Sequence, residues 1–148
     1  MAKNKTVVIH QDYYRFIFNP AGAGSKPNSN VIHRMIEHNT AVALQTGYDV
    51  ILEGILSVKS YQSIIERLIK SHPGKSYIFY FDISFKETVR RHQAKNEKLS
   101  YGKKEMEKWY LAAKKSGHKL ETLIPESFSK NKIIKKFLEI SKFESTTK

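Results

Sequence analysis

Residues 48–56 read YDVILEGIL, and this stretch decides the fold class of the chain. Its apolar run, 50–52, ends directly in the carboxylate of Glu53. The residues that follow, 57–72, carry apolar side chains at helical spacing. A strand, a turn and a helix in this order are typical of a parallel sheet, in which ligands bind beyond the carboxyl ends of the strands. Glu53 is therefore predicted to stand at the edge of a functional site.

The same alternation of strands and helices continues in both directions from this stretch. It predicts an α/β fold of three layers, with a mainly parallel sheet of about four strands and flanking helices. The apolar runs also suit strands that are covered on both faces. We expect a single domain over 1–142 and a disordered tail over 143–148. The predicted strands are 6–10, 49–53, 76–83 and 120–124, and the predicted helices are 31–46, 60–71, a helix from Ser84, 103–116 and a helix from Ser129, with a loop over 19–30.

The composition favours anionic partners, because 26 Lys and Arg residues face 14 Asp and Glu residues, for a net charge of +12. The basic residues are spread along the chain, which makes nucleic acid an improbable partner. The absence of cysteine excludes disulfides and thiol catalysis. No stretch approaches the ~20 apolar residues of a membrane span, so we expect a cytoplasmic protein.

An acid stands at or near the carboxyl end of three predicted strands, namely Asp12, Glu53 and Asp82. Right-handed crossovers would bring these carboxyl ends to one edge of the sheet. Arg90 and Arg91 follow the third strand and could neutralise a phosphoryl group in transfer. The plainer alternatives are a turn or cap for Asp12 and a solvated helix face for the arginines. Asp82 lies two residues before a helix cap and is more simply structural.

One segment has a composition similar to that of a phosphate-binding loop. Residues 22–26, GAGSK, contain the residue types of such a loop but not the order GxxxxGK[ST]. An atypical anion loop remains an alternative here, in which 16–18 would form the preceding strand and 28–46 the following helix.

Five segments together resemble a family of small bacterial P-loop kinases, the kinase-like ATPases related to zeta toxins and to nucleoside or antibiotic kinases. The resemblance covers about 6–138 and rests on the order of its motifs. The five segments are VVIHQDYYR at 7–15, GYDVILEGIL at 47–56, YIFYFDISFKETVRRHQ at 77–93, YGKKEMEKWY at 101–110 and LIPE at 123–126.

The resemblance implies transfer of a phosphoryl group from ATP, with Mg²⁺, to a hydroxyl of a nucleoside, sugar or antibiotic-like acceptor. By this comparison Asp12 matches the catalytic base, and Arg15 lies near the acceptor. Glu53 matches a ligand of the acceptor or of Mg²⁺. Arg91 matches the arginine that contacts nucleotide phosphates. Lys95 stands where the family often has a second arginine of the lid, so bidentate phosphate geometry is lost there.

The main departure from the family lies at the amino-terminal end. Such kinases begin with a strand, the Walker A loop GxxGxGK[ST] and a helix, and these parts have no counterpart here. The strand concerned is normally central, so 49–53 and 76–83 would each expose an edge or pair with one another, and self-association becomes plausible. A truncated reading frame or a shortened relative would explain the difference, and either predicts impaired activity. A non-catalytic basic protein that binds nucleic acid or another anion is the alternative function.

Overall fold

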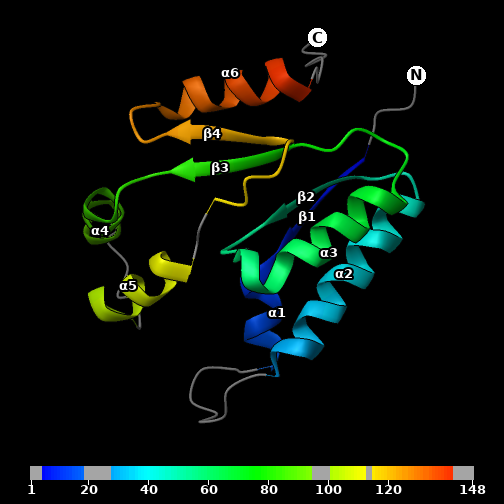
Figure 1. Cartoon of the computed structure of the whole chain (residues 1–148), viewed down its shortest axis with the longest axis horizontal. Coiled ribbons are helices and arrows are strands. Elements are labelled where there is room, and N and C mark those ends of the chain that lie inside the picture. The colour runs from blue at the N-terminus through cyan, green and yellow to red at the C-terminus, as the bar shows by residue number, and fades with distance from the viewer. Residues whose placement is uncertain (1–4, 19–27, 95–100, 113–114, 142–148) are drawn as a thin grey trace. The chain divides into compact units, whose positions relative to one another are not determined.

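The computed structural model describes residues 5–18, 28–94, 101–112 and 115–141 of the chain. Its internal contacts divide the chain into two compact units. Figure 1 colours the chain from blue at the N-terminus to red at the C-terminus. Unit 1 comprises Met1–Lys75 with Ala112–Lys114, and unit 2 comprises Ser76–Leu111 with Lys115–Lys148. The expectation of a single domain over 1–142 stays a prediction, and the predicted tail lies outside the described residues.

Unit 1 is a parallel pair of strands with helices packed on one face. Strand β1 pairs with β2 in a register that runs from Thr6 opposite Asp49 to His10 opposite Glu53. Helices α2 and α3 lie side by side (Figure 1). The elements are β1 (Thr6–His10), α1 (Gln11–Phe18), α2 (Ser29–Gln45), β2 (Asp49–Glu53) and α3 (Val58–Ser71).

The core of unit 1 lies between the strand pair and these helices. Ile36 of α2 is fully buried, and Tyr61 and Ile64 of α3 are nearly so. Tyr61 and Ile64 lie three residues apart, and spacings of three or four residues place apolar side chains on one face of a helix. Such a face packs against the strands, which explains why these segments form helices. On the opposite face of the strand pair, Val8 is 44% exposed and Ile51 is 52% exposed. Within unit 1, helices therefore cover one face of the strand pair, and cover of the other face stays a prediction.

Unit 2 is a second parallel pair. Strand β3 pairs with β4 from Ile78 opposite Glu121 to Asp82 opposite Pro125. Helix α6 packs on this pair through Phe137, whose ring stacks on Phe79 with centroids 4.1 Å apart. Its elements are β3 (Ile78–Asp82), α4 (Phe85–Gln93), α5 (Lys103–Ala112), β4 (Glu121–Pro125) and α6 (Lys130–Ser141).

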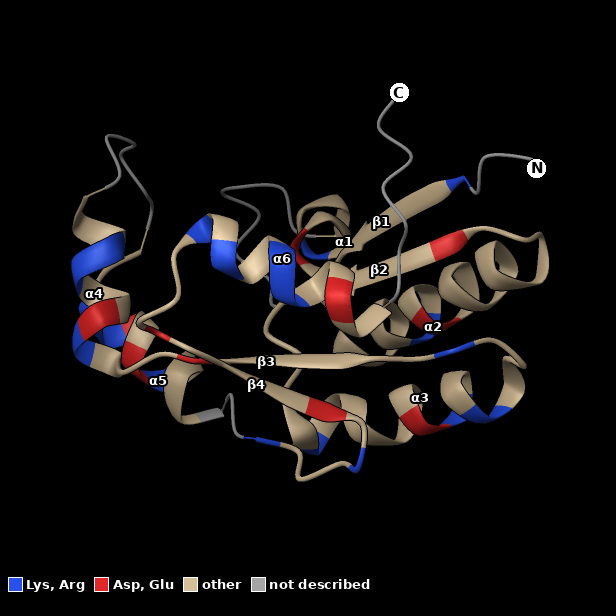
Figure 2. Cartoon of the chain, turned by 90° about the horizontal axis from the view of Figure 1, so that it is seen from above, with Lys and Arg blue, Asp and Glu red and all other residues tan. Residues whose placement is uncertain are grey.

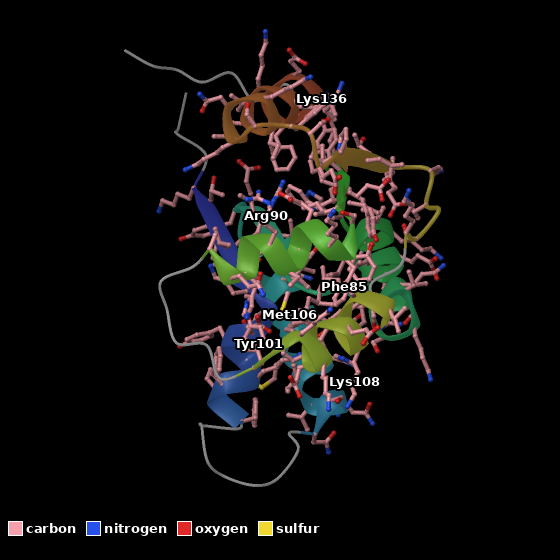
Figure 3. The ribbon with its side chains drawn as sticks, turned by 90° about the vertical axis from the view of Figure 1, so that its left-hand side faces the viewer. Phe85, Arg90, Tyr101, Met106, Lys108 and Lys136 are labelled. Carbon is pink, nitrogen blue, oxygen red and sulfur yellow. The ribbon has the colours of Figure 1, made fainter. Side chains whose placement is uncertain are left out.

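Aromatic rings join helix α4 to helix α5 and the residues before it. Phe85 packs against Tyr110 with ring centroids 5.3 Å apart, and Tyr101 lies between His92 and Trp109. Figure 3 shows Phe85 on α4 near the ribbon of α5. Each of these ring contacts contributes roughly 1 kcal/mol. Together they hold helix α4, which carries Arg90 and Arg91, against α5 and the residues before it.

The α/β class and the parallel pairing are confirmed, and all four predicted strands are present. They pair two by two and do not form one sheet of four. Within the described residues neither β2 nor β3 pairs with a third strand, so each leaves one edge unpaired. No helix in the described part of the chain is long and apolar enough to cross a membrane.

One local prediction is wrong, and one part of the alternative with an anion loop is not borne out. Residues 16–18 belong to helix α1 and not to a strand, because α1 runs without a break from Gln11 and buries Gln11 and Tyr14 on one face. Helix α2 begins at Ser29, inside the predicted loop, where the side chain of Asn28 accepts a hydrogen bond from the amide of Asn30 and caps the helix. The candidate loop 22–26 lies outside the described residues.

Candidate functional site

The carboxyl ends of β1 and β2 meet at a pair of polar side chains. His10 and Glu53 are register partners, and His10 Nδ1 is hydrogen-bonded to Glu53 Oε1. Both side chains are more than half exposed, so the pair faces solvent. A hydrogen bond at Nδ1 fixes the orientation of the ring, and Nε2 is the ring nitrogen that remains for another partner. Sequence reasoning missed His10, although its place at the end of a parallel strand was a sufficient signal.

Helix α1 begins at the residue after His10, and this places Asp12 in its first turn. A carboxylate there is favoured by the positive end of the helix dipole. Arg15 lies one turn further on. The charges of Asp12 and Arg15 both act on the phenol of Tyr61, whose pKa is raised chiefly by burial. The three predicted residues of unit 1, Asp12, Arg15 and Glu53, therefore belong to one end of the strand pair.

A buried amide supports this end of unit 1. Gln11 is fully buried, and its Nε2 donates a hydrogen bond of 2.8 Å to the hydroxyl of Tyr61. Its Oε1 has no hydrogen-bond partner among the described residues. Gly54, with φ of +146°, brings its backbone against the same side chain. The close approach explains why a glycine follows Glu53, since only glycine adopts such a φ readily.

Unit 2 holds the predicted arginines, and the structure pairs them with an acid of their own helix. Glu87 accepts two hydrogen bonds of 2.7 Å from Arg90 and a third of 2.7 Å from Arg91. Arg91 also donates to the backbone carbonyl of Glu126 at 3.1 Å. Arg90 lies on α4 in Figure 3. A phosphate would have to compete with Glu87 for both guanidinium groups.

Two further predictions concern the same unit. Asp82 forms an ion pair with Lys115 at 2.7 Å, which agrees with the structural role expected for it. The predicted cap is confirmed, since Ser84 Oγ accepts a hydrogen bond from the amide of Glu87. The carboxylate of Glu126 accepts from the amide of Ser84, where a capping box would use Glu87 itself. Lys95 lies outside the described residues.

Magnesium at Glu53 stays a prediction. The carboxylate already bonds His10, so a metal ion at this position would compete with the imidazole for the same oxygen atom. The described residues contain no group of three His, Asp or Glu side chains placed to hold a metal ion.

The contacts of Glu87 lead to a test by pH. Hydrogen bonds from Arg90 and Arg91 lower the pKa of Glu87 to about 2, against an ordinary value of 4.5. Because the folded pKa is the lower one, these bonds stabilise the fold above pH 4.5 and lose their effect as the pH falls towards 2. A titration of the Glu87 carboxyl by carbon NMR is expected to show a midpoint near 2.

The paired variant Arg90→Gln/Arg91→Gln should return this midpoint to the ordinary range, because both causes of the shift are removed. Lys86→Gln is the matched control, since Lys86 is exposed on the same helix and is not among the causes of that shift. An ordinary midpoint in the unmodified protein would contradict the arrangement of these three side chains.

Comparisons with known proteins identify no relative: no family model, no curated protein and no solved structure matches the chain.

Proposed function

We propose that the chain is a phosphotransferase-type α/β protein whose strand pair β1–β2 receives a small hydroxyl-bearing acceptor, such as a nucleoside, sugar or antibiotic-like molecule. Asp12 would accept a proton from the acceptor hydroxyl, and Arg15 would bind its polar groups. The pair of His10 and Glu53 would orient it. The resemblance of five segments to small kinases supports this proposal, together with the polar groups at the strand ends.

The hydrogen bond between His10 and Glu53 across two parallel strands carries this proposal. Ligands of parallel sheets bind at the carboxyl ends of strands, and this pair stands there with Asp12 on the adjoining helix. A carboxylate within reach of a hydroxyl can serve as a general base. Asp12 is exposed and forms no ion pair among the described residues, so it is available to an incoming molecule.

The nucleotide half of such a reaction has weaker support. The sequence lacks GxxxxGK[ST], so the backbone amides and the lysine that hold phosphates have no assigned residues. The arginines proposed for phosphate contact are bound to Glu87. We therefore expect the chain to bind Mg-ATP weakly or not at all. Micromolar binding in a calorimetric titration would contradict this expectation and would direct attention to residues 22–26.

Acceptor binding is tested by NMR titration of the full chain with uridine, glucose and kanamycin. One of the three is expected to shift the amide signals of residues 10–15 and 53–54 in a saturable manner. Asp12→Asn should weaken that binding roughly tenfold, the value of one hydrogen bond to a charged group. Glu66→Gln is the matched control, because it removes the same charge from an exposed position of α3.

Equal weakening by the two variants would show that net charge and not Asp12 governs binding. Absence of saturable shifts from all three molecules at millimolar concentration would reject the proposed acceptor site.

A second candidate function, binding of nucleic acid, is favoured by helix α6. The helix carries four lysines, Lys130, Lys132, Lys135 and Lys136, against one acid, Glu139. Figure 2 shows its basic residues in blue, and Lys136 is labelled in Figure 3. Within the described residues these lysines form no ion pair. Binding of mixed DNA or RNA that falls steeply with salt would support this function, and absent or salt-insensitive binding would dismiss it.

A further inference from the structure

A polar groove runs between helices α2 and α3 of unit 1. It has a volume of about 460 Å³ and is open to solvent. The two helices lie side by side in Figure 1. The residues that line the groove are Asn30, His33, Arg34, Glu37, Ser60, Ser63, Ile64 and Arg67.

The spacing of the lining residues explains how the groove forms. On each helix they follow one another at intervals of three, one and three residues, so each set occupies a single face. Ile64 is the only apolar residue among those that line the groove, and it is buried. The remaining side chains offer hydroxyl, amide, imidazole, guanidinium and carboxylate groups. None of these polar side chains is buried, so a ligand can reach them from solvent.

The charges in the groove are unequal. Arg67 binds Glu37 through two hydrogen bonds of 2.6 and 2.8 Å, and these bonds lower the pKa of Glu37. Arg34, which also lines the groove, has no carboxylate partner among the described residues. Arg15 lies close enough for its charge to act on the ring of His33. The groove therefore presents one paired guanidinium and one guanidinium that is available to a ligand.

We propose that this groove binds a small molecule carrying a phosphate group, with Arg34 as the principal ligand of the phosphate. A guanidinium group matches phosphate oxygens in bidentate geometry. The hydroxyls of Ser60 and Ser63 can donate further hydrogen bonds to the phosphate or accept them from hydroxyls of the same molecule. The site does not depend on the proposed function, since Asp12, Glu53 and His10 are not among its lining residues.

Glu37 sets the strength of this site. Its carboxylate repels an anion and occupies the second guanidinium, that of Arg67. Replacing Glu37 by glutamine would remove the repulsion and release Arg67 to the ligand. A general effect of net charge on an anion would give the same two signs, so control variants outside the groove must separate the site from the charge.

The test is an NMR titration of the full chain with glucose 6-phosphate, with glucose and inorganic phosphate as separate arms. Glucose 6-phosphate is expected to shift amide signals of residues 30–37 and 60–67 to saturation. Arg34→Gln should weaken binding about tenfold, and Glu37→Gln should strengthen it several-fold. Lys70→Gln is the matched control, because it removes one positive charge from an exposed position of α3 outside the groove. Circular dichroism of each variant confirms that it folds.

The arms separate the sources of affinity. Binding of inorganic phosphate alone to the same signals would still support the phosphate site, whereas binding of glucose as tight as that of its phosphate would overturn it. Equal losses in Arg34→Gln and Lys70→Gln, weaker binding by Glu37→Gln, or no saturable shift in the groove would each overturn the proposal.

Discussion

Replacing Gly54 by alanine is expected to lower the free energy of unfolding of unit 1 by about 3 kcal/mol. Two costs combine in this variant. Gly54 has φ of +146°, a conformation that alanine adopts only with strain, and the new Cβ would lie 2.5 Å from Cβ of Gln11. The Gln11 atom is next to the backbone and cannot turn away, so the start of α1 must shift. Amide hydrogen exchange in β1, β2 and α3 would measure the loss.

Gly47→Ala is the matched control for this prediction. Gly47 also has a positive φ, of +82°, but a Cβ added there would meet no atom within 4 Å. Its replacement should cost only the backbone strain, about 1 kcal/mol. Trp109, the single tryptophan, belongs to unit 2, so its fluorescence reports on that unit separately. Equal losses in the two variants would contradict the close approach of Gly54 to Gln11.

Replacing Tyr61 by phenylalanine is expected to cost about 2 kcal/mol, although it removes a single oxygen atom. That oxygen accepts the hydrogen bond from Gln11 Nε2. Gln11 is fully buried, and its Oε1 already lacks a partner among the described residues. The variant would leave the whole amide without a protein partner in the interior. Hydrogen exchange in unit 1, or urea unfolding followed by signals of its core, would measure the effect.

Two further variants separate this cause from the loss of a hydroxyl in general. Tyr14→Phe removes a hydroxyl that accepts from Asn39 at 2.8 Å, but Asn39 is exposed and water can replace the bond, so the cost should be below about 1 kcal/mol. Gln11→Met/Tyr61→Phe removes both polar partners and should recover most of the lost stability. A loss in Tyr61→Phe no greater than that in Tyr14→Phe would reject the explanation.

The strands were predictable from the sequence because their apolar runs are short, β-branched or aromatic, and bounded by turn residues. Residues 50–52 and 78–81 are of this kind, and both lie in strands. The parallel direction was predictable, but the partner of each strand was not. Hydrophobic patterns locate strands along the chain and do not indicate which strand lies beside which. The exposure of Val8 and Ile51 was not predictable for the same reason: an apolar side chain indicates a tendency to be buried, not the partner that buries it.

Helix α1 was missed because its signal is short. It has only eight residues, and exposed aromatic side chains such as Phe16 and Phe18 imitate the composition of a strand. The spacing of Gln11 and Tyr14, three residues apart, was the available sign of a helix. Glutamine is rarely buried, so Gln11 was not counted as a buried residue, and its spacing of three residues from Tyr14 was not taken as a sign of a helix.

The candidate site was predictable in part. The place of Asp12 and Glu53 could be predicted because acids that follow apolar strands in a parallel sheet stand at its carboxyl edge, while their roles stay predictions. Arg90 and Arg91 were interpreted as groups that bind a ligand, whereas both bind Glu87, which lies three and four residues before them. That spacing is visible in the sequence and is the usual one for ion pairs along a helix. The bond between His10 and Glu53 required the register of β1 on β2.

Strand β1 passes into helix α1 with no residue between His10 and Gln11. Each added residue would turn the helix by about 100° relative to the strand and would carry Asp12 away from Glu53. Substitution at this junction changes a side chain, but insertion or deletion changes the direction of every side chain that follows. Variation in chain length is therefore best placed elsewhere, and an engineered library that probes this end of unit 1 should hold the length of residues 6–18 constant.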